Sequence, residues 1–575
     1  MKKTIAIIIT FSMVISLAAR GCQEVEEKGI FTAGTYDEVG TGKYGDVAVS
    51  TTFTSDRIEK IVVGDHSETQ GFFEVPVEKI PAAIIESQSL AVDVITGATM
   101  TSDAILEAVE KAAVNAGADI SKLKEKVNSE EKPGESVEYT TDVVVVGAGI
   151  AGLSAALEAH NNGAKVILIE KMPIAGGSTI RSGGKILAAG TDIQKANGIE
   201  DTPEAFKDFL VEVGENEINE EYAAMIANNS AENIQWLIDN GVEMNENIEV
   251  LHSTIQPARG LWTAEGTGAG FTQPLEAKLK EEKVEILYST PATELIEKDG
   301  TVIGVMASND NGDTITINAE VVILATGGYT HNKEMMAEFH PFLKNVVTNT
   351  SEGNTGDGII MGEKVGANLI MKEGAIDIAT NPMTYYGYGE EFKGLFVSES
   401  GERFLDESIF HFTRTRVMLE KGINNFWAIT PEYNDRVGES IAAGFGFEAN
   451  TIEELQELIK GEKLIETVNQ YNALAKNGSD TDFGKKAEYM KPIEGEKVYA
   501  LKMILSNSGT FGGLDTDIDS RVVREDGTVI KGLYAAGEVG SGHFLHKEYP
   551  GSGTAIISFL TFGRIAGENA ANDIK

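Results

Sequence analysis

A run of four valines at residues 143–146 leads directly into G-A-G-I-A-G at residues 147–152. A buried strand that opens into such a turn and then into a helix is typical of dinucleotide binding. Gly147 allows the tight turn, Gly149 lets the backbone approach a pyrophosphate, and Gly152 lets the helix pack close to the strand. Glu170 stands 23 residues after Gly147, where a ribose hydroxyl needs an acceptor. The motif therefore predicts a nucleotide-binding α/β domain.

The residues around this motif have the texture of an α/β fold, with short apolar runs alternating with helical spacing. We expect a helix at residues 150–161 and strands at 142–146, 165–170, 284–287, 302–307 and 321–325. Residues 371–505 differ, because they carry amphipathic helices, such as 464–475, and an aromatic-rich loop. A second domain is therefore predicted inside the first.

Residues 31–115 predict a separate small α+β unit. Val47, Val49, Thr51 and Phe53 alternate with smaller or polar residues, as in a half-buried strand, and residues 58–63 are its expected partner. Residues 101–113 have helical spacing. The charged stretch between residues 118 and 139, broken by proline and glycine, predicts a linker.

The N-terminus predicts export. Lys2 and Lys3 precede an apolar run at residues 5–19 that is short for a transmembrane helix. Cys22 follows, as in a bacterial lipoprotein signal at residues 1–22 in which the cysteine is lipidated, although Arg20 stands where a small residue is usual. The alternative is cleavage near residue 18 or 19 that leaves a free cysteine. Both predict an extracytoplasmic protein, outside the reach of the NAD(P)H pool, and the lipid would attach it to the membrane surface.

Charge and cysteine content exclude several functions. Asp and Glu number 89 against 48 Lys and Arg, a formal charge of −41 that disfavours nucleic acid. One cysteine excludes internal disulfides, a cysteine-rich zinc site and covalent haem attachment. We therefore expect no metal site and no haem.

Four further segments, at residues 176–184, 325–328, 355–358 and 532–538, resemble the flavoprotein subunits of the fumarate reductase/succinate dehydrogenase superfamily. The resemblance implies one non-covalent FAD held by residues 140–370 and 506–575, with a mobile capping domain at 371–505. The cofactor residues that it implies are Gly147, Ala148, Gly149, Gly152, Glu170, Lys171, Gly177, Ser178, Thr179, Gly183, Gly184, Ala292, Asp357, Glu538, Ala555 and Ile556.

The sequence T-G-A-T-M-T at residues 96–101 resembles the attachment motif of FMN-binding domains, and H-S-E-T at residues 66–69 fits the same domain. The resemblance implies an FMN-binding domain at residues 30–118, a linker at 119–139, and FMN carried on Thr101 through a phosphoester. Taken alone, the string is also a helix N-cap. An FMN domain followed by a fumarate-reductase-like domain is the layout of extracytoplasmic reductases such as urocanate reductases.

The pocket departs from the dicarboxylate pattern of fumarate reductases. Ser508 and Asn381 stand where that family has histidines, and the segment Y-P-G-S-G at residues 549–553 stands where it has an arginine. This segment is similar to one in 3-ketosteroid dehydrogenases, which implies that Tyr549 and the N–H of Gly553 hold a ketone oxygen. The alternative is a turn that only packs under the flavin.

The proton donor has several candidates. Counting seven residues past the pair at 403–404 reaches His411, and a three-residue insertion would bring Arg414 there. Tyr386 belongs to a cluster of phenols in the cap, as ketosteroid enzymes use. Equally, Arg414 and Arg416 could form surface ion pairs, and the aromatic cluster could be core.

Together these features predict a C=C reductase that takes electrons at FMN from a quinol- or flavin-linked membrane donor, passes them to FAD, and reduces a small ketosteroid-like enone. One alternative is reduction of an unsaturated monocarboxylate related to urocanate, cinnamate or fumarate, with Arg414 or Arg416 pairing the acid. The other is a non-catalytic electron-transfer flavoprotein.

Overall fold

The computed structural model describes residues 29–43, 45–68, 72–125, 134–248, 257–343, 346–382 and 387–574. The signal segment with Cys22, and also Thr69 and Tyr386, lie outside these residues. The chain divides into two compact units, one of residues 1–67, 79–93 and 103–127, the other of residues 68–78, 94–102 and 128–575. Within the described residues, no helix combines the length and the apolar character needed to cross a membrane.

The N-terminal part contains an antiparallel sheet in the order β1-β2-β3. Its strands are β1 (Gly34–Thr41), β2 (Asp46–Phe53) and β3 (Ile58–Val63), and its helices are α1 (Glu74–Ser87), α2 (Thr99–Asn115) and α3 (Ile120–Leu123). Val47, Val49 and Phe53 are buried on one face of β2, as the alternation predicted. At Gly40 a Cβ would lie 1.8 Å from the carbonyl oxygen of Ala104, so α2 rests directly on β1.

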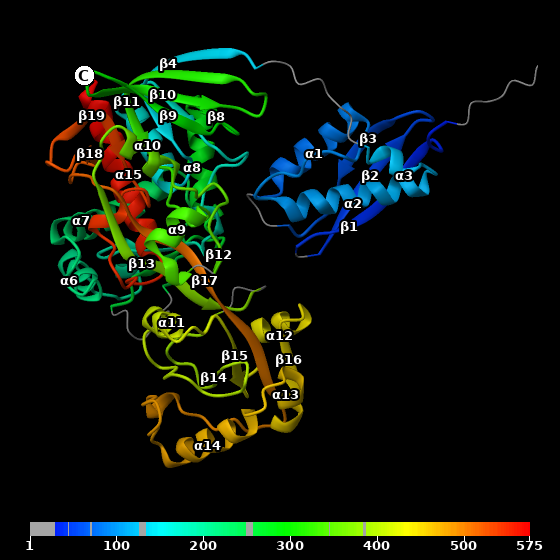
Figure 1. The fold of residues 1–575 in the computed structure, drawn as a ribbon, viewed down its shortest axis with the longest axis vertical. Helices are drawn as coiled ribbons and strands as arrows, with labels where there is room; N and C mark the ends of the chain where they lie inside the picture. Colours follow the sequence, from blue (N-terminus) through cyan, green and yellow to red (C-terminus); the bar gives the residue numbers. More distant parts are fainter. Residues whose placement is uncertain are drawn as a thin grey trace, which may run out of the picture. The chain divides into compact units, whose positions relative to one another are not determined.

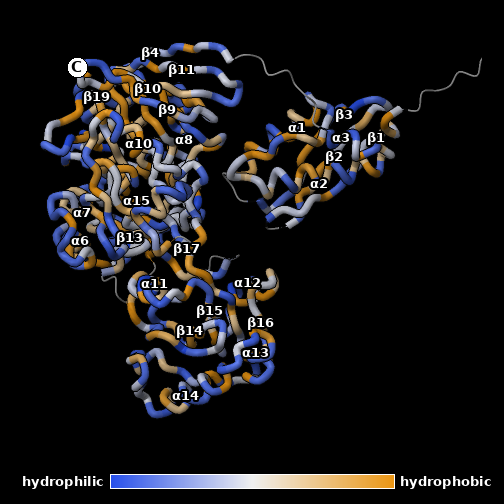
Figure 2. Tube along the Cα trace, in the orientation of Figure 1, coloured by the Kyte–Doolittle hydropathy of each residue, from blue (hydrophilic) through white to orange (hydrophobic). Residues whose placement is uncertain are grey.

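The larger unit is built on a sheet in the order β18-β19-β10-β11-β4-β5-β8, with β9 beside β10. Strands β11, β4, β5 and β8 are parallel, and helices cover them, which is why residues 143–146 are apolar without alternation. Figure 2 shows hydrophobic colour along inner strands such as β10 and β19. The bounds are β4 (Ser136–Val146), β5 (Val166–Ile169), β8 (Glu285–Leu287), β9 (Ala292–Lys298), β10 (Thr301–Ser308), β11 (Thr314–Leu324), β18 (Arg521–Val523) and β19 (Val529–Ala535).

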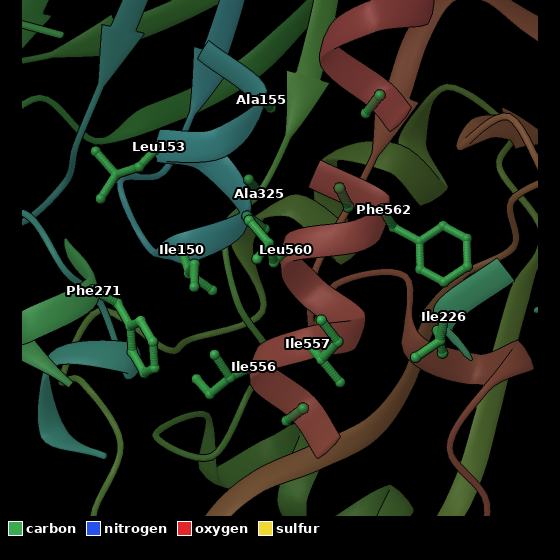
Figure 3. Packing of buried hydrophobic residues seen from close by; sticks show 14 of the residues in the cluster. Ile150, Leu153, Ala155, Ile226, Phe271, Ala325, Ile556, Ile557, Leu560 and Phe562 are labelled. Carbon is green, nitrogen blue, oxygen red and sulfur yellow. The ribbon is translucent and has the colours of Figure 1, made fainter. Parts of the chain in front are cut away.

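Helix α4 (Ile150–Asn161) packs against α15 (Thr554–Asp573), and their contact forms the centre of the core (Figure 3). Glycines let the two backbones approach: a Cβ at Gly563 would lie 2.5 Å from the Ala151 oxygen, and one at Gly567 would lie 2.3 Å from the Ala155 oxygen. The remaining elements around this sheet are α5 (Asp192–Ala196), α6 (Pro203–Val213), α7 (Glu220–Asp239), α8 (Ala269–Glu281), α9 (Lys333–Phe339), α10 (Asp357–Lys364), β6 (Lys185–Leu187) and β7 (Gly260–Trp262).

A second, six-stranded sheet forms the inserted cap. The long antiparallel strands β13 (Leu369–Thr380) and β17 (Val498–Leu514) run from the main sheet into the cap (Figure 1). The predicted boundaries near residues 370 and 505 fall within these strands. The same sheet includes β12 (Val347–Thr348), which precedes the cap in the sequence. The other cap elements are β14 (Leu395–Val397), β15 (Asn425–Thr430), β16 (Gly446–Ala449), α11 (His411–Glu420), α12 (Asp435–Ala442), α13 (Ile452–Ile459) and α14 (Leu464–Asn477).

Candidate flavin and substrate site

The turn between β4 and α4 leaves no room for side chains on its inner side. Gly147 has φ +104°, and a Cβ there would lie 2.4 Å from the carbonyl oxygen of Ala325. A Cβ at Gly152 would lie 1.8 Å from the Gly147 oxygen. At Gly149 the nearest atom would be Thr179 Oγ1 at 3.9 Å, so the outer side is open. This geometry fits a pyrophosphate against the positive end of α4.

Glu170 is buried beside this turn. Its carboxylate accepts hydrogen bonds from the N–H groups of Ala148, at 2.6 Å, and Met172, at 2.8 Å. Burial raises the pKa of Glu170, and these amide donors oppose that shift. The next residue, Lys171, pairs with Asp357 at 2.8 Å. Three residues implied as cofactor contacts therefore lie together at the end of β5 and the start of α10.

A second group of buried polar side chains, besides the one around Glu170, surrounds Glu538; we call it the Glu538 cradle. Its carboxylate accepts from the N–H of Thr510 at 2.7 Å and from Nδ2 of Asn354 at 3.0 Å. The same amide donates to Ser178 Oγ at 3.3 Å. The Asn354 Oδ1 and Thr326 Oγ1 atoms are buried and lack a hydrogen-bond partner among the described residues. Such atoms fit a polar ligand that completes their bonding, as FAD would.

Asn354 and Thr510 were missed by sequence reasoning. Asn354 directly precedes the T-G-D-G motif, and Thr510 lies in the segment compared only for its missing histidine. Their positions on separate segments give no local signal. The tertiary structure brings them to Glu538.

Three glycines and one alanine are further predicted FAD residues: Gly177, Gly183, Gly184 and Ala292. Gly177 and Gly184 have φ +50° and +72°, and a Cβ at Gly184 would lie 2.5 Å from the Thr267 nitrogen. At Gly183 a Cβ would reach only the Trp262 ring, at 3.9 Å. Ala292 begins β9 and pairs with Ala307. Gly184 thus leaves no room for a Cβ, whereas a Cβ at Gly177 or Gly183 would make only ordinary contacts.

Tyr549 lies buried below the start of α15. Its hydroxyl oxygen accepts the N–H of Ala555 at 2.9 Å, and Ile556 follows on the same buried helix turn. Burial raises the Tyr549 pKa, and the nearby N–H groups of Ala555, Gly553 and Thr554 oppose this. The N–H of Gly553 thus faces the phenol itself. The phenol keeps its proton and remains able to donate it.

The first turn of α11 brings His411 and Phe412 to this place. The Phe412 ring meets the Tyr549 ring edge-on, with centroids 4.8 Å apart. His411 Nδ1 lies 3.0 Å from Glu390 Oε1, and the His411 N–H donates to the same oxygen. The side chain of Glu390 is fully buried. An imidazole oriented by a carboxylate is suited to proton transfer.

Both arginines of α11 have partners for their terminal nitrogens, whereas the buried Nε of Arg414 has no hydrogen-bond partner among the described residues. Arg414 is buried, donates to the carbonyl oxygens of Tyr388, Gly389 and Glu407, and lies 5.0 Å from the Phe396 ring centroid. Burial lowers its pKa to about 10. Arg416 lies on the surface side and pairs with Glu548 at 2.6 Å.

Thr101 occupies the first turn of α2 in the N-terminal part. Its Oγ1 donates to Glu68 Oε2 at 2.5 Å. A helix N-terminus favours a phosphate, and Thr101 supplies a hydroxyl in the first turn of α2. The residues present therefore fit a phosphate ester at this hydroxyl.

Comparison with known families identifies both cofactor domains. Residues 142–556 match the FAD binding domain, and residues 42–114 match the FMN-binding domain. The chain is 30% identical to NADH:acrylate oxidoreductase from Vibrio harveyi, over 94% of this chain and 61% of that protein. It therefore spans less than two thirds of that relative. It is 31% identical to urocanate reductase from Eggerthella lenta, over 97% of this chain and 96% of that protein.

A solved structure shows the same architecture. The open conformation of a flavocytochrome c3 fumarate reductase superposes with a TM-score of 0.66 at 28% identity, over 79% of this chain and 81% of that chain. The predicted α/β fold, with an FAD-binding domain and a separate small FMN-binding domain, is confirmed.

Proposed function

The chain belongs to the FAD-binding flavoproteins of the fumarate reductase type, and from that premise we propose that it reduces a C=C bond conjugated to a carbonyl group. FAD, when bound, would supply hydride to the β-carbon of the acceptor. The chain's own residues would hold the carbonyl oxygen, exclude water and protonate the α-carbon. The preferred acceptor is a small enone, including ketosteroid-like enones.

The arrangement of Tyr549 carries this proposal. Because its oxygen accepts the N–H of Ala555, its own proton is left to donate to a substrate oxygen. Negative charge grows on that oxygen as hydride arrives, so the hydrogen bond strengthens in the transition state. The positive end of the α15 helix dipole would further stabilise this negative charge. Phe412 and Phe511 beside Tyr549 provide apolar walls.

His411 is the proposed acid. Glu390 would hold its ring in one orientation, and Phe412, the next residue, is in contact with Tyr549. Arg414 instead serves three backbone carbonyl oxygens, which gives it a structural role in holding the segment at 388–389 to α11. Tyr386 stays a further candidate from the sequence.

The charges around α11 favour an acceptor with few carboxylates. Arg414 is engaged by carbonyl oxygens and Arg416 by Glu548, so a dianion would have to displace existing partners. An unsaturated monocarboxylate is the second candidate, because the similarity to a urocanate reductase extends over almost the whole of both chains. A non-catalytic electron carrier would need no buried acid and phenol beneath a cap.

Electrons would enter through the N-terminal domain. We propose FMN esterified to Thr101, whose hydroxyl is held by Glu68, and a quinol- or flavin-linked membrane donor. The signal at residues 1–22 supports an extracytoplasmic location, with lipid on Cys22 as the attachment to the membrane.

The decisive experiment uses the full chain loaded with both flavins. Reduced with dithionite, it is mixed with a panel of enones and unsaturated mono- and dicarboxylates, and flavin reoxidation is followed by absorbance. We expect rapid reoxidation by a neutral enone or a monocarboxylate, and slow reoxidation by dicarboxylates. Failure of every conjugated acceptor would overturn the reductase proposal and favour the electron carrier.

A further inference from the structure

We propose that Arg416 and Glu548 form a positioning pair that fixes helix α11, with His411, over the loop that carries Tyr549. The expected effect on turnover rests on the proposed function. The interaction itself is an ion pair between the cap and the FAD-binding part of the chain. Arg416 thereby has a role in assembling the site and not in binding a substrate carboxylate.

The pair joins elements far apart in the sequence. Arg416 Nη1 lies 2.6 Å from Glu548 Oε1, and the Glu548 side chain is only 9% exposed. A carboxylate this buried keeps its charge only if it is paired, so breaking the pair leaves a costly orphan. The contact is therefore selective for the docked position of α11.

The same face of α11 carries the aromatic contact. Phe412 and Arg416 are four residues apart, so their side chains lie one above the other on the helix. Phe412 meets Tyr549, and Arg416 meets the residue immediately before it. Two consecutive loop residues, Glu548 and Tyr549, thus contact one face of α11. Together these contacts fix how far α11 lies from the loop and how it is rotated about its own axis. Because His411 is adjacent to Phe412, these two contacts also position His411.

A strained loop supplies a second acceptor. Glu215 Oε1 lies 3.6 Å from Arg416 Nη1. Glu215 and Asn216 follow the C-terminus of α6 with φ +57° and +61°, a left-handed pair without glycine. Asparagine tolerates this region and glutamate does so poorly, so the loop holds free energy that its contacts must offset. The Glu215 carboxylate of this loop lies within ion-pair distance of α11.

The charges that surround Glu548 determine how the Arg416–Glu548 ion pair responds to pH. Arg416 and Lys547 attract its carboxylate, whereas Glu215 repels it, and burial raises the Glu548 pKa. As pH falls through that pKa, Glu548 becomes neutral and the ion pair with Arg416 is lost, so α11 loses its charged contact with the loop that carries Tyr549. Docking is strongest above that pKa.

The test compares Arg416→Gln, Glu548→Gln and the double variant, each with FAD bound, against Arg436→Gln. Arg436 is exposed on α12 and pairs with Glu439, so Arg436→Gln removes a cap arginine without affecting the contacts of α11. We expect each single variant to lower kcat at least tenfold with the neutral enone and with the monocarboxylate alike. The double variant should lose no more than the worse single, because the two residues act as one unit. Arg436→Gln should leave kcat within twofold.

Amide hydrogen exchange tests the role of the Arg416–Glu548 ion pair without any substrate. Amides of residues 411–420 and 549–553 should exchange at least tenfold faster in Arg416→Gln and Glu548→Gln, and Arg416→Lys should restore part of the protection. This readout stays valid if no acceptor reoxidises the flavin, so failure of the proposed function is distinguishable. Unchanged exchange in both variants overturns the proposal. So does an Arg416→Gln defect confined to the KM of carboxylate acceptors while Glu548→Gln behaves as wild type.

Discussion

The amide of Ala555 donates a 2.9 Å hydrogen bond to the hydroxyl oxygen of Tyr549, six residues earlier in the chain. The phenol oxygen thereby accepts from one of the N–H groups at the start of α15 that lack a partner within the helix, and its own O–H group is left to donate. One residue thus has two roles, because it caps a buried helix and it remains a donor for the proposed acceptor.

Replacing Tyr549 with phenylalanine separates these roles. Loss of a donor to the developing oxyanion typically costs about 2.7–4 kcal/mol, so kcat should fall roughly a hundredfold to a thousandfold with little change in KM. The buried Ala555 N–H also loses its acceptor, which should lower the unfolding free energy by about 1–3 kcal/mol. Steady-state kinetics, FAD content and thermal unfolding check both effects. Near-normal turnover with the enone would remove Tyr549 from the reaction.

Thr101→Ala should lack the mass of one FMN after denaturation, whereas the wild type made with the flavin-transferring machinery should carry it. FAD should be retained, because its cradle is built from other residues. Turnover driven by the membrane donor should be lost, and reduction by a small donor that reaches FAD directly should survive. Ser102→Ala, at the neighbouring hydroxyl, is the matched control and should keep the FMN. Wild type without added mass would refute covalent attachment.

His411 and Arg414 should fail in different ways. His411→Gln should lower kcat by about 10²–10⁴, the usual contribution of a general acid, and leave the fold intact. Arg414→Gln should destabilise the cap, because each buried carbonyl oxygen left without a donor costs roughly 1–3 kcal/mol. Kinetics and thermal unfolding measured on both variants distinguish them. A stable Arg414→Gln protein with turnover abolished would exchange the two assignments.

Asp377 gives a pH dependence of stability. It is buried on β13, accepts from Asn507 Nδ2 at 2.9 Å, and burial raises its pKa to about 7. A carboxyl whose folded pKa exceeds its unfolded value of about 3.9 contributes stability that is complete below pH ~4 and lost as pH rises through ~7. The loss amounts to at most about 4 kcal/mol.

Asp377→Asn, which resembles the protonated acid, should remove this dependence and raise the thermal midpoint at pH 7.5 relative to wild type. The difference between the two proteins should shrink toward pH 4.5. Asp310→Asn, at an exposed turn, should follow the wild type. Parallel curves for wild type and Asp377→Asn across this range would show that Asp377 does not titrate there.

Local sequence patterns predicted most elements well. The helix at residues 150–161 begins and ends where expected, and the expected strand at 302–307 is β10 with one further residue at each end. Helix α2 begins two residues before the predicted start and ends two after its end. These elements follow from hydrophobic period and from glycine at turns, which are properties of neighbouring residues.

Such local patterns could not predict contacts between residues that are far apart in the sequence. Glu538 was implied as a cofactor residue, but its partners Asn354 and Thr510 come from other segments. The pairing of His411 with Glu390 likewise depends on the path of the cap loop. Nothing in the spacing of these residues encodes the distance between their side chains.

The sequence by itself determined the nucleotide-binding turn, the order of the domains and the chemical types in the pocket, because these depend on glycine conformations, hydrophobic period and residue identity. Only the tertiary structure decided which polar groups are engaged. Arg414 and Arg416 look alike in the sequence, but one is buried among carbonyl oxygens and the other is tied to Glu548. The physical reason is that burial and pairing set the free energy of a charge, and both arise when β17 and α11 bring separated segments together.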